Sequence, residues 1–177
     1  MSLRLTVFFA LLVLVFTAPV AAEQTAPETL DWETLMPQDF RPDDLFDKYK
    51  IDELEDGDPL AVEFMRELKA AWKAAPVVES LDGRLVKLPG FVVPLETRGE
   101  EVVEFFLVPY FGACIHVPPP PANQMIYVVM PAGKGLSGDV LNGAIWVSGK
   151  LSIKRTSNEL GDAGYMMQAS LVEPYEE

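Results

Sequence analysis

The pattern of apolar and polar positions changes at Val77. Before it, apolar residues recur every four positions, at Leu60, Phe64, Leu68 and Trp72. This spacing places them on one face of an α-helix. Asp58-Pro59 provides an N-cap followed by proline at the first helical position, and Pro76 ends the pattern. We therefore predict a helix from 58 to about 75, whose apolar stripe packs onto a sheet.

After Val77, apolar positions tend to alternate with polar ones, and β-branched and aromatic residues are frequent, as is typical of strands. The pattern predicts strands at 85–95, 102–108, 125–130, 145–153 and 165–172. Pro89-Gly90 indicates a bulge or bend in the first strand, and 102–108 is apolar enough to be buried on both faces.

Gly149 lies in the middle of the fourth predicted strand, where glycine allows the sharp bend of a barrel corner. We therefore predict a mainly β fold with flanking α: a small, closed or nearly closed, five-stranded antiparallel barrel of the OB-like kind. The N-terminal helices pack outside it. An open sandwich or an α+β roll would give nearly the same pattern.

The first 22 residues have the features of a cleavable signal peptide. Arg4 precedes an apolar run from Leu5 to Phe16, and Val20-Ala21-Ala22 precedes Glu23. The run of roughly a dozen residues is shorter than the roughly 20 that span a bilayer. We therefore expect a periplasmic protein, exported through this signal, with no integral membrane segment after cleavage.

Charge divides the rest of the chain. Residues 23–58 hold 13 acidic side chains against three basic ones, and a short helix is predicted there between 42 and 54. We predict a signal peptide at 1–22, an acidic helical extension at 23–76 and a barrel-like domain at 77–177. The whole chain has a net charge of −13, which argues against nucleic acid as a partner.

The chain has one cysteine and one histidine, Cys114 and His116. In an extended segment, residues two positions apart project to the same side, and thiolate and imidazole together suit zinc or copper ions. We predict both residues as metal ligands. Further ligands would come from Asp139, Glu104, Met125 for Cu(I), water or another chain. The alternative is a small buried cysteine beside a loop histidine.

Four prolines follow this pair and form a stiff polyproline II rod. Proline-rich segments present preformed shapes to partners, although the run could also simply stiffen its loop. The predicted interaction residues are Pro118, Pro119, Pro120, Pro121, Asn123 and Gln124.

A thiol-dependent enzyme is a further alternative, in which a nearby imidazolium activates the Cys114 thiol. Asn123 could orient His116, and Gly112 could supply a backbone N–H for an oxyanion. Because the sequence has a single cysteine and so no Cys-x-x-Cys pair, we assign no catalytic residue.

The stretch from Phe111 to Gln124, with its Cys-x-His-x-Pro-Pro-Pro-Pro segment, resembles a family of exported bacterial proteins named domain of unknown function 3299. The resemblance also includes 81–95 and 146–175. It implies a periplasmic protein whose genes often lie near those of an ABC-type transporter linked to zinc. We expect a non-enzymatic accessory protein that binds zinc or another soft metal ion and assists such a transport system. Its partners would be transporter components or another periplasmic protein; the alternative is an interaction module that uses the proline-rich loop without metal.

Overall fold

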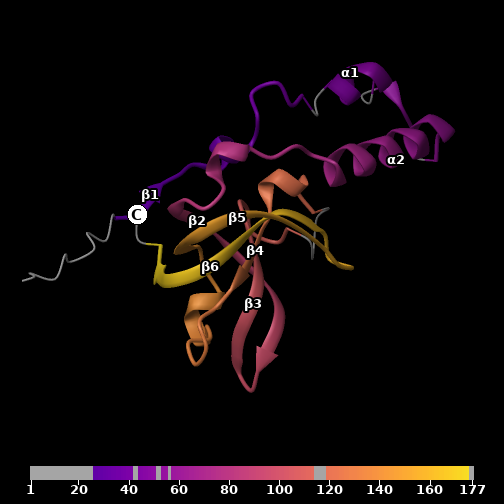
Figure 1. The fold of residues 1–177 in the computed structure, drawn as a ribbon. Coiled ribbons are helices and arrows are strands. Elements are labelled where there is room, and N and C mark those ends of the chain that lie inside the picture. Colours follow the sequence, from indigo (N-terminus) through magenta and orange to yellow (C-terminus); the bar gives the residue numbers. More distant parts are fainter. Residues whose placement is uncertain (1–25, 42–43, 51–52, 56, 114–118, 176–177) are drawn as a thin grey trace, which may run out of the picture.

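The computed structural model describes residues 26–41, 44–50, 53–55, 57–113 and 119–175. Within these ranges the protein has two α-helices and a six-stranded sheet (Figure 1). The helices are α1 (Asp44–Tyr49) and α2 (Pro59–Lys73). The strands are β1 (Glu28–Thr29), β2 (Leu85–Arg98), β3 (Glu101–Val108), β4 (Ile126–Val129), β5 (Ile145–Ser157) and β6 (Asp162–Pro174). The prediction of a mainly β fold is confirmed.

The strands β2 to β6 pair in a closed ring. The sheet order is β1-β2-β3-β4-β6-β5, and β2 also pairs with β5. All five predicted strands are present as β2 to β6, but the predicted number of strands was wrong, because β1 adds a sixth strand along β2. With only two residues, β1 is too short to produce an alternating pattern.

The prediction of an entirely antiparallel sheet was also wrong. Strands β1 and β2 are parallel, and so are β4 and β6. The second parallel pair follows from the ring itself. Antiparallel neighbours must alternate in direction, and five strands in a closed ring cannot alternate all the way round. Since β2–β3, β3–β4, β2–β5 and β5–β6 are antiparallel, the remaining pair must be parallel.

Two glycines lie at special positions of the ring: one where a strand changes neighbours, and one where two strands approach closely. Strand β2 pairs with β5 up to Gly90 and with β3 from Phe91 onward, so Pro89-Gly90 lies where the strand changes neighbours. At Gly149 the register between β5 and β6 shifts. A Cβ atom there would lie 2.3 Å from the Gln168 carbonyl oxygen, so glycine is required by the close approach of β6.

The main hydrophobic core lies among the strands of the ring and includes the fully buried Phe105, Leu107 and Tyr165. A second cluster contains Phe106 and Val108. Successive residues of β3 thus enter different clusters, which confirms that this strand is buried on both faces.

Residues 28–35 cover part of this core. Leu30 and Leu35 belong to it, and the Leu30 backbone N–H donates to the Lys87 carbonyl at 2.9 Å. The buried Tyr165 hydroxyl donates to the Leu35 carbonyl at 2.8 Å and accepts from the Val78 N–H at 2.7 Å. Burial raises the pKa of Tyr165, so this phenol stays protonated and can make both bonds.

The helix α2 begins as predicted, with the Asp58 carboxylate accepting a hydrogen bond from the Leu60 N–H at 2.8 Å. Its packing differs from the prediction. The ring of Phe64 lies edge-on to Phe46 and Tyr49, at centroid distances of 5.1 and 5.7 Å. Neither buried residue of α2 belongs to the two core clusters of the ring, so the helix does not join the core of the sheet, and Phe64 packs against α1.

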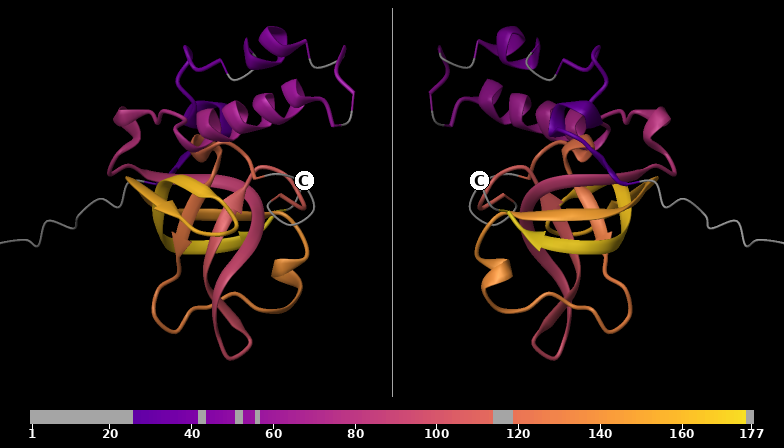
Figure 2. Two further views of the ribbon diagram at one scale, coloured as in Figure 1. Left: turned by 90° about the vertical axis from the view of Figure 1, so that its right-hand side faces the viewer. Right: turned by 90° about the vertical axis from the view of Figure 1, so that its left-hand side faces the viewer.

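The two helices lie together at one end of the ring, and the β2–β3 hairpin projects from the opposite end (Figure 2). The short helix predicted between 42 and 54 corresponds to α1, whose helical turns are limited to Asp44–Tyr49. In the described ranges, the longest helices fall short of the length and apolar character needed to cross a bilayer.

Candidate functional site

The predicted metal ligands Cys114 and His116, together with Pro118, fall at 114–118, outside the described residues. The chain on both sides is held by the protein. Ala113 is fully buried in the second core cluster, and Pro120 is buried as well. A buried residue thus precedes the predicted ligands, and another follows them.

The prolines after this segment are only partly open to solvent: Pro120 is buried, and Pro119 and Pro121 are half-buried. Pro121 has φ −55° and ψ 152°, close to the polyproline II conformation. It leads directly into a short 3-10 helix, Ala122–Gln124. The prolines available to a partner in this part of the chain are thus Pro119 and Pro121.

The two amides that follow bind inside the protein. Asn123 is fully buried, and its Nδ2 donates to the Pro76 carbonyl at 2.9 Å. The Nε2 of Gln124 donates to the Trp32 carbonyl at 2.8 Å. These bonds hold the end of the proline-rich loop against residues that precede the ring. The Oδ1 atom of Asn123 is buried and has no hydrogen-bond partner within the described ranges.

Glu104 and Met125, two of the other suggested ligands, already have neighbours in the protein. Glu104 accepts a hydrogen bond from the Tyr127 hydroxyl, and burial together with this carboxylate raises the pKa of Tyr127 to about 12. Met125 is fully buried in the second cluster, and Asp139 belongs to a short 3-10 helix, Gly138–Leu141. Among the residues that the structure describes, no three His, Cys, Asp or Glu side chains form a group that could hold a metal ion.

An exposed aromatic side chain lies just before the segment 114–118. Phe111 is 70% exposed, and its ring is edge-on to Phe91 at a centroid distance of 5.8 Å. Tyr110 next to it is also exposed. Large exposed aromatic groups are frequent where proteins meet partners.

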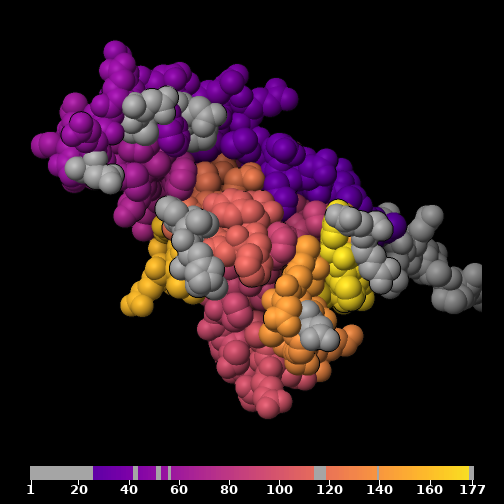
Figure 3. Space-filling view, turned by 180° about the vertical axis from the view of Figure 1, so that it is seen from behind, coloured from indigo at the N-terminus to yellow at the C-terminus, as the bar shows by residue number. Residues whose placement is uncertain are grey.

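A groove of about 550 Å³ lies between the helices, the prolines after 118 and the turn joining β5 to β6. Its lining is mainly apolar and includes Phe64, Met65, Leu68, Trp72, Pro119 and Leu160. Figure 3 shows the helices, in purple and magenta, as a lobe over one end of the strands. The groove exists because α2 packs on α1 and leaves part of its apolar stripe uncovered.

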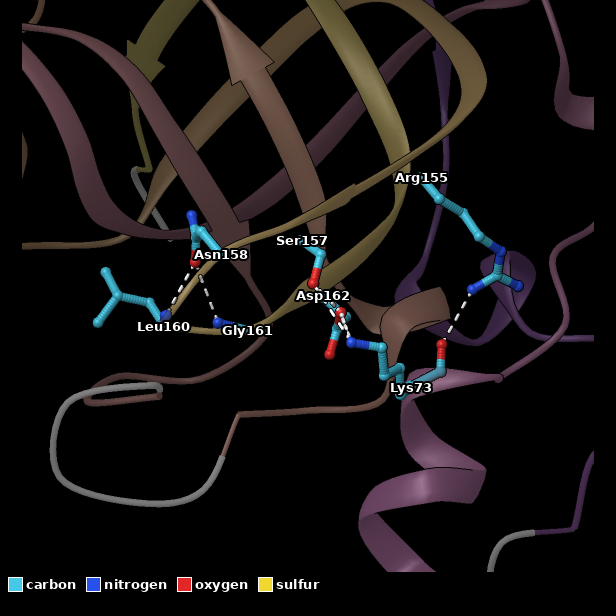
Figure 4. A network of polar contacts seen from close by, with 7 residues as sticks. All are labelled: Lys73, Arg155, Ser157, Asn158, Leu160, Gly161 and Asp162. Atoms are coloured by element: carbon cyan, nitrogen blue, oxygen red, sulfur yellow. Dashed lines mark hydrogen bonds and ion pairs between the residues drawn. The ribbon is translucent and has the colours of Figure 1, made fainter.

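Polar contacts close one side of the groove (Figure 4). Lys73 at the end of α2 forms an ion pair with Asp162 at 3.1 Å. The guanidinium of Arg155 donates to the carbonyls of Lys73 at 3.1 Å and Ala75 at 2.7 Å. Carbonyls at the end of a helix lack intrahelical partners, so Arg155 both caps α2 and ties it to β5.

The turn between β5 and β6 is stabilised by one asparagine side chain. The Oδ1 atom of Asn158 accepts from the backbone N–H groups of Leu160 at 2.8 Å and Gly161 at 3.2 Å (Figure 4). Such side-chain bonds to the following backbone stabilise tight turns. This arrangement fixes the turn in which Leu160 lines the groove.

The family of the chain follows from its match to a family model. The model described as "Protein of unknown function (DUF3299)" matches residues 32–174. The chain belongs to the DUF3299 family. This confirms the resemblance found in the sequence, and the match begins within the acidic stretch that precedes the ring. No curated protein matches the chain.

A solved DUF3299 structure has a similar fold. The crystal structure of a DUF3299 family protein from Pseudomonas aeruginosa PAO1 is 42% identical to this chain, with a TM-score of 0.63. The match covers 86% of this chain and 98% of that one.

Sequence reasoning did not find the groove or the helix cap formed by Arg155. The apolar stripe of α2 was assigned to the sheet, so no unfilled apolar surface was expected. One signal was available: Leu160 is an isolated large apolar residue in the polar segment 154–162.

Proposed function

We propose that this DUF3299 protein is a non-enzymatic periplasmic accessory protein that binds zinc or another soft metal ion through Cys114 and His116. It would assist an ABC-type transport system. The observation that carries the proposal is that the only thiol and the only imidazole of the chain are two positions apart. Thiolate and imidazole are preferred ligands of these ions.

The buried neighbours of this segment support the proposal. Cys114 directly follows the fully buried Ala113, and Pro120 is buried as well. Only residues 114–119 separate these two buried residues, and a short connection allows two ligands fewer relative positions than a long loop would. Two protein ligands leave coordination positions for water or for another protein, which suits an accessory protein that transfers its ion.

The proposed location follows from the signal-like residues 1–22, with their apolar run and small residues before Glu23. We also infer that the ring is an OB-like barrel. OB folds are five-stranded, partly open Greek-key barrels, and β2 to β6 make a ring of this size. In this proposal the barrel is the scaffold, and the loop from 109 to 125 carries the function.

The test measures zinc bound by the mature protein after equilibrium dialysis, in the wild type and in C114S and H116A. We expect about one ion per chain in the wild type and a loss of at least tenfold in affinity in each variant. E100Q is the control, because it removes one exposed carboxylate in the turn between β2 and β3 and reports unspecific binding to an acidic protein. Equal zinc binding by all four proteins would contradict the proposal.

The second candidate is a protein-interaction module that needs no metal. It is favoured by Phe111, which is 70% exposed beside the proline-rich loop. The variant F111S should lose proteins that co-purify with the wild type, while C114S keeps them. The reverse result, loss in C114S and retention in F111S, would favour the metal-dependent function.

A further inference from the structure

The groove between α2 and the β5–β6 turn has the properties of a small-molecule site. Its volume of about 550 Å³ is in the range of about 300–1,000 Å³ found for such sites. Phe64 and Leu68 of its lining are buried, while Met65 and Leu160 are 38% and 37% exposed. The groove thus combines a buried apolar floor with apolar side chains that are still partly in contact with water.

We propose that this groove binds the hydrocarbon chain of a single-chain amphiphile with a carboxylate head group. The apolar lining comes from three parts of the chain: α2, the prolines after 118 and the turn before β6. A flexible hydrocarbon chain can contact all three. Covering Met65 and Leu160 removes apolar surface from water, which is the main favourable contribution to binding.

The sign of the head group follows from Lys69. Lys69 and Lys73 both line the groove, one turn apart on α2. Lys73 is paired with Asp162 at 3.1 Å, whereas Lys69 has no ion pair or hydrogen bond to any residue that the structure describes. Lys69 is therefore the cation of this groove that is available to a carboxylate.

A second polar group in the lining lacks a partner. The indole Nε1–H of Trp72 is buried, and no acceptor reaches it in the described part of the chain. Indole N–H groups are donors only, and a buried donor without an acceptor is unfavourable. A carboxylate brings acceptors and no donor, so its chemistry suits Lys69, which is exposed; it reaches the Trp72 donor only if the indole turns toward the groove.

Negative charge in the groove and in the whole chain opposes an anion and limits the affinity. Glu159 and Asp162 also line the groove, with Asp162 paired to Lys73, and the chain as a whole has a net charge of −13. Long-range attraction of the carboxylate is therefore excluded. The apolar contacts supply most of the affinity, and Lys69 selects the sign of the head group.

The test uses dodecanoate as the probe and the mature full-length chain, with binding measured by isothermal titration calorimetry. We expect saturable binding of one dodecanoate per chain, and at least tenfold weaker binding of both octanoate and dodecyltrimethylammonium. Octanoate tests the contribution of chain length, and dodecyltrimethylammonium tests the sign of the head group. Equal affinity for the two dodecyl compounds, or no saturable binding of dodecanoate, would overturn the proposal.

Variants locate the binding. M65E and L160E introduce a charge into partly exposed lining positions and should weaken dodecanoate binding at least tenfold; K69E should remove the preference for the anion. The matched control is V62E, which changes a residue of α2 that is 67% exposed and outside the lining. Far-UV circular dichroism and thermal melting verify that each variant is folded. Equal weakening by V62E and M65E would overturn the assignment.

Two further measurements separate this site from other functions. C114S/H116A should bind dodecanoate as the wild type does, because it leaves Met65, Lys69 and Leu160 of the lining unchanged. Flotation with phosphatidylglycerol vesicles distinguishes a free amphiphile from a membrane surface. Vesicle binding that M65E abolishes, without binding of free dodecanoate, would replace the proposal by membrane attachment.

Discussion

Residues 28–35 and residues 44–73 both lie before the ring and both carry net negative charge, yet they relate to the ring in opposite ways. The first segment contributes Leu30 and Leu35 to the main core. The second packs mainly on itself, through the contacts of Phe64 with α1. Charge cannot distinguish them, because both are acidic. What separates them is whether their apolar side chains reach the interior of the ring.

The largest expected effect comes from Leu35→Ala. Leu35 is fully buried in the main core, so we expect its truncation to lower the free energy of unfolding by about 2–5 kcal/mol. Urea denaturation followed by tryptophan fluorescence measures this. The control is Leu60→Ala on α2, a change at an exposed position that should stay within about 0.5 kcal/mol. Similar losses in both variants would remove the contrast between the two segments.

Tyr165→Phe tests how the first segment is held. The variant leaves the Leu35 carbonyl and the Val78 N–H without their shared partner. Since buried polar groups without partners are unfavourable, we expect a loss of about 1–3 kcal/mol in the free energy of unfolding. Tyr175→Phe, at an exposed tyrosine, is the matched control. A Tyr165→Phe protein as stable as the wild type would show that this link is not needed.

Phe64→Ala should act locally on the second segment. It removes both edge-on ring contacts between α2 and α1, so the two helices should open without the ring. Hydrogen exchange should become faster for amides of α1 and α2 and stay unchanged in β2 to β6, with about 1 kcal/mol or less lost in the unfolding of the ring. Faster exchange throughout β2 to β6 would mean that the helices and the ring are one cooperative unit.

The last prediction concerns the ring, to which both segments are compared. The pKa of Tyr127 is raised from 10.0 to about 12 by burial and by Glu104. The folded protein then holds this proton longer than the unfolded chain, so the free energy of unfolding should fall from about pH 10 to about pH 12. Absorbance at 295 nm follows the titration, and Glu104→Gln should lower the pKa. A Tyr127 that titrates near 10 in the wild type would contradict this contact.

Most of the fold could be predicted from local patterns. Helix α2 and the longer strands show clear periodicity, β3 and β4 are marked by runs of β-branched and aromatic residues, and Asp58-Pro59 marks the start of α2. The two-residue β1 has no periodicity to detect. The parallel pairing of β4 with β6 required a global argument, because it follows from the odd number of strands in the closed ring.

The candidate sites differ in how visible they are in the sequence. Cys114 and His116 stand out because each is the only residue of its type. The groove depends on where α2 lies relative to Leu160, about 90 residues later in the chain. The apolar stripe of α2 has the same spacing in the sequence whether it covers a sheet, another helix or a ligand. Only the three-dimensional structure therefore reveals that part of this helix lines a groove.

The last strand also determines when the fold can be completed. Strand β6 (Asp162–Pro174) pairs with β4 on one side and β5 on the other, so a growing chain that ends before residue 162 leaves both with open edges. Contacts between segments far apart in sequence form slowly, and unpaired strand edges promote aggregation. Closure of the ring must therefore wait until β6 has been synthesised, and deletion of β6 should yield an aggregating chain instead of a smaller domain.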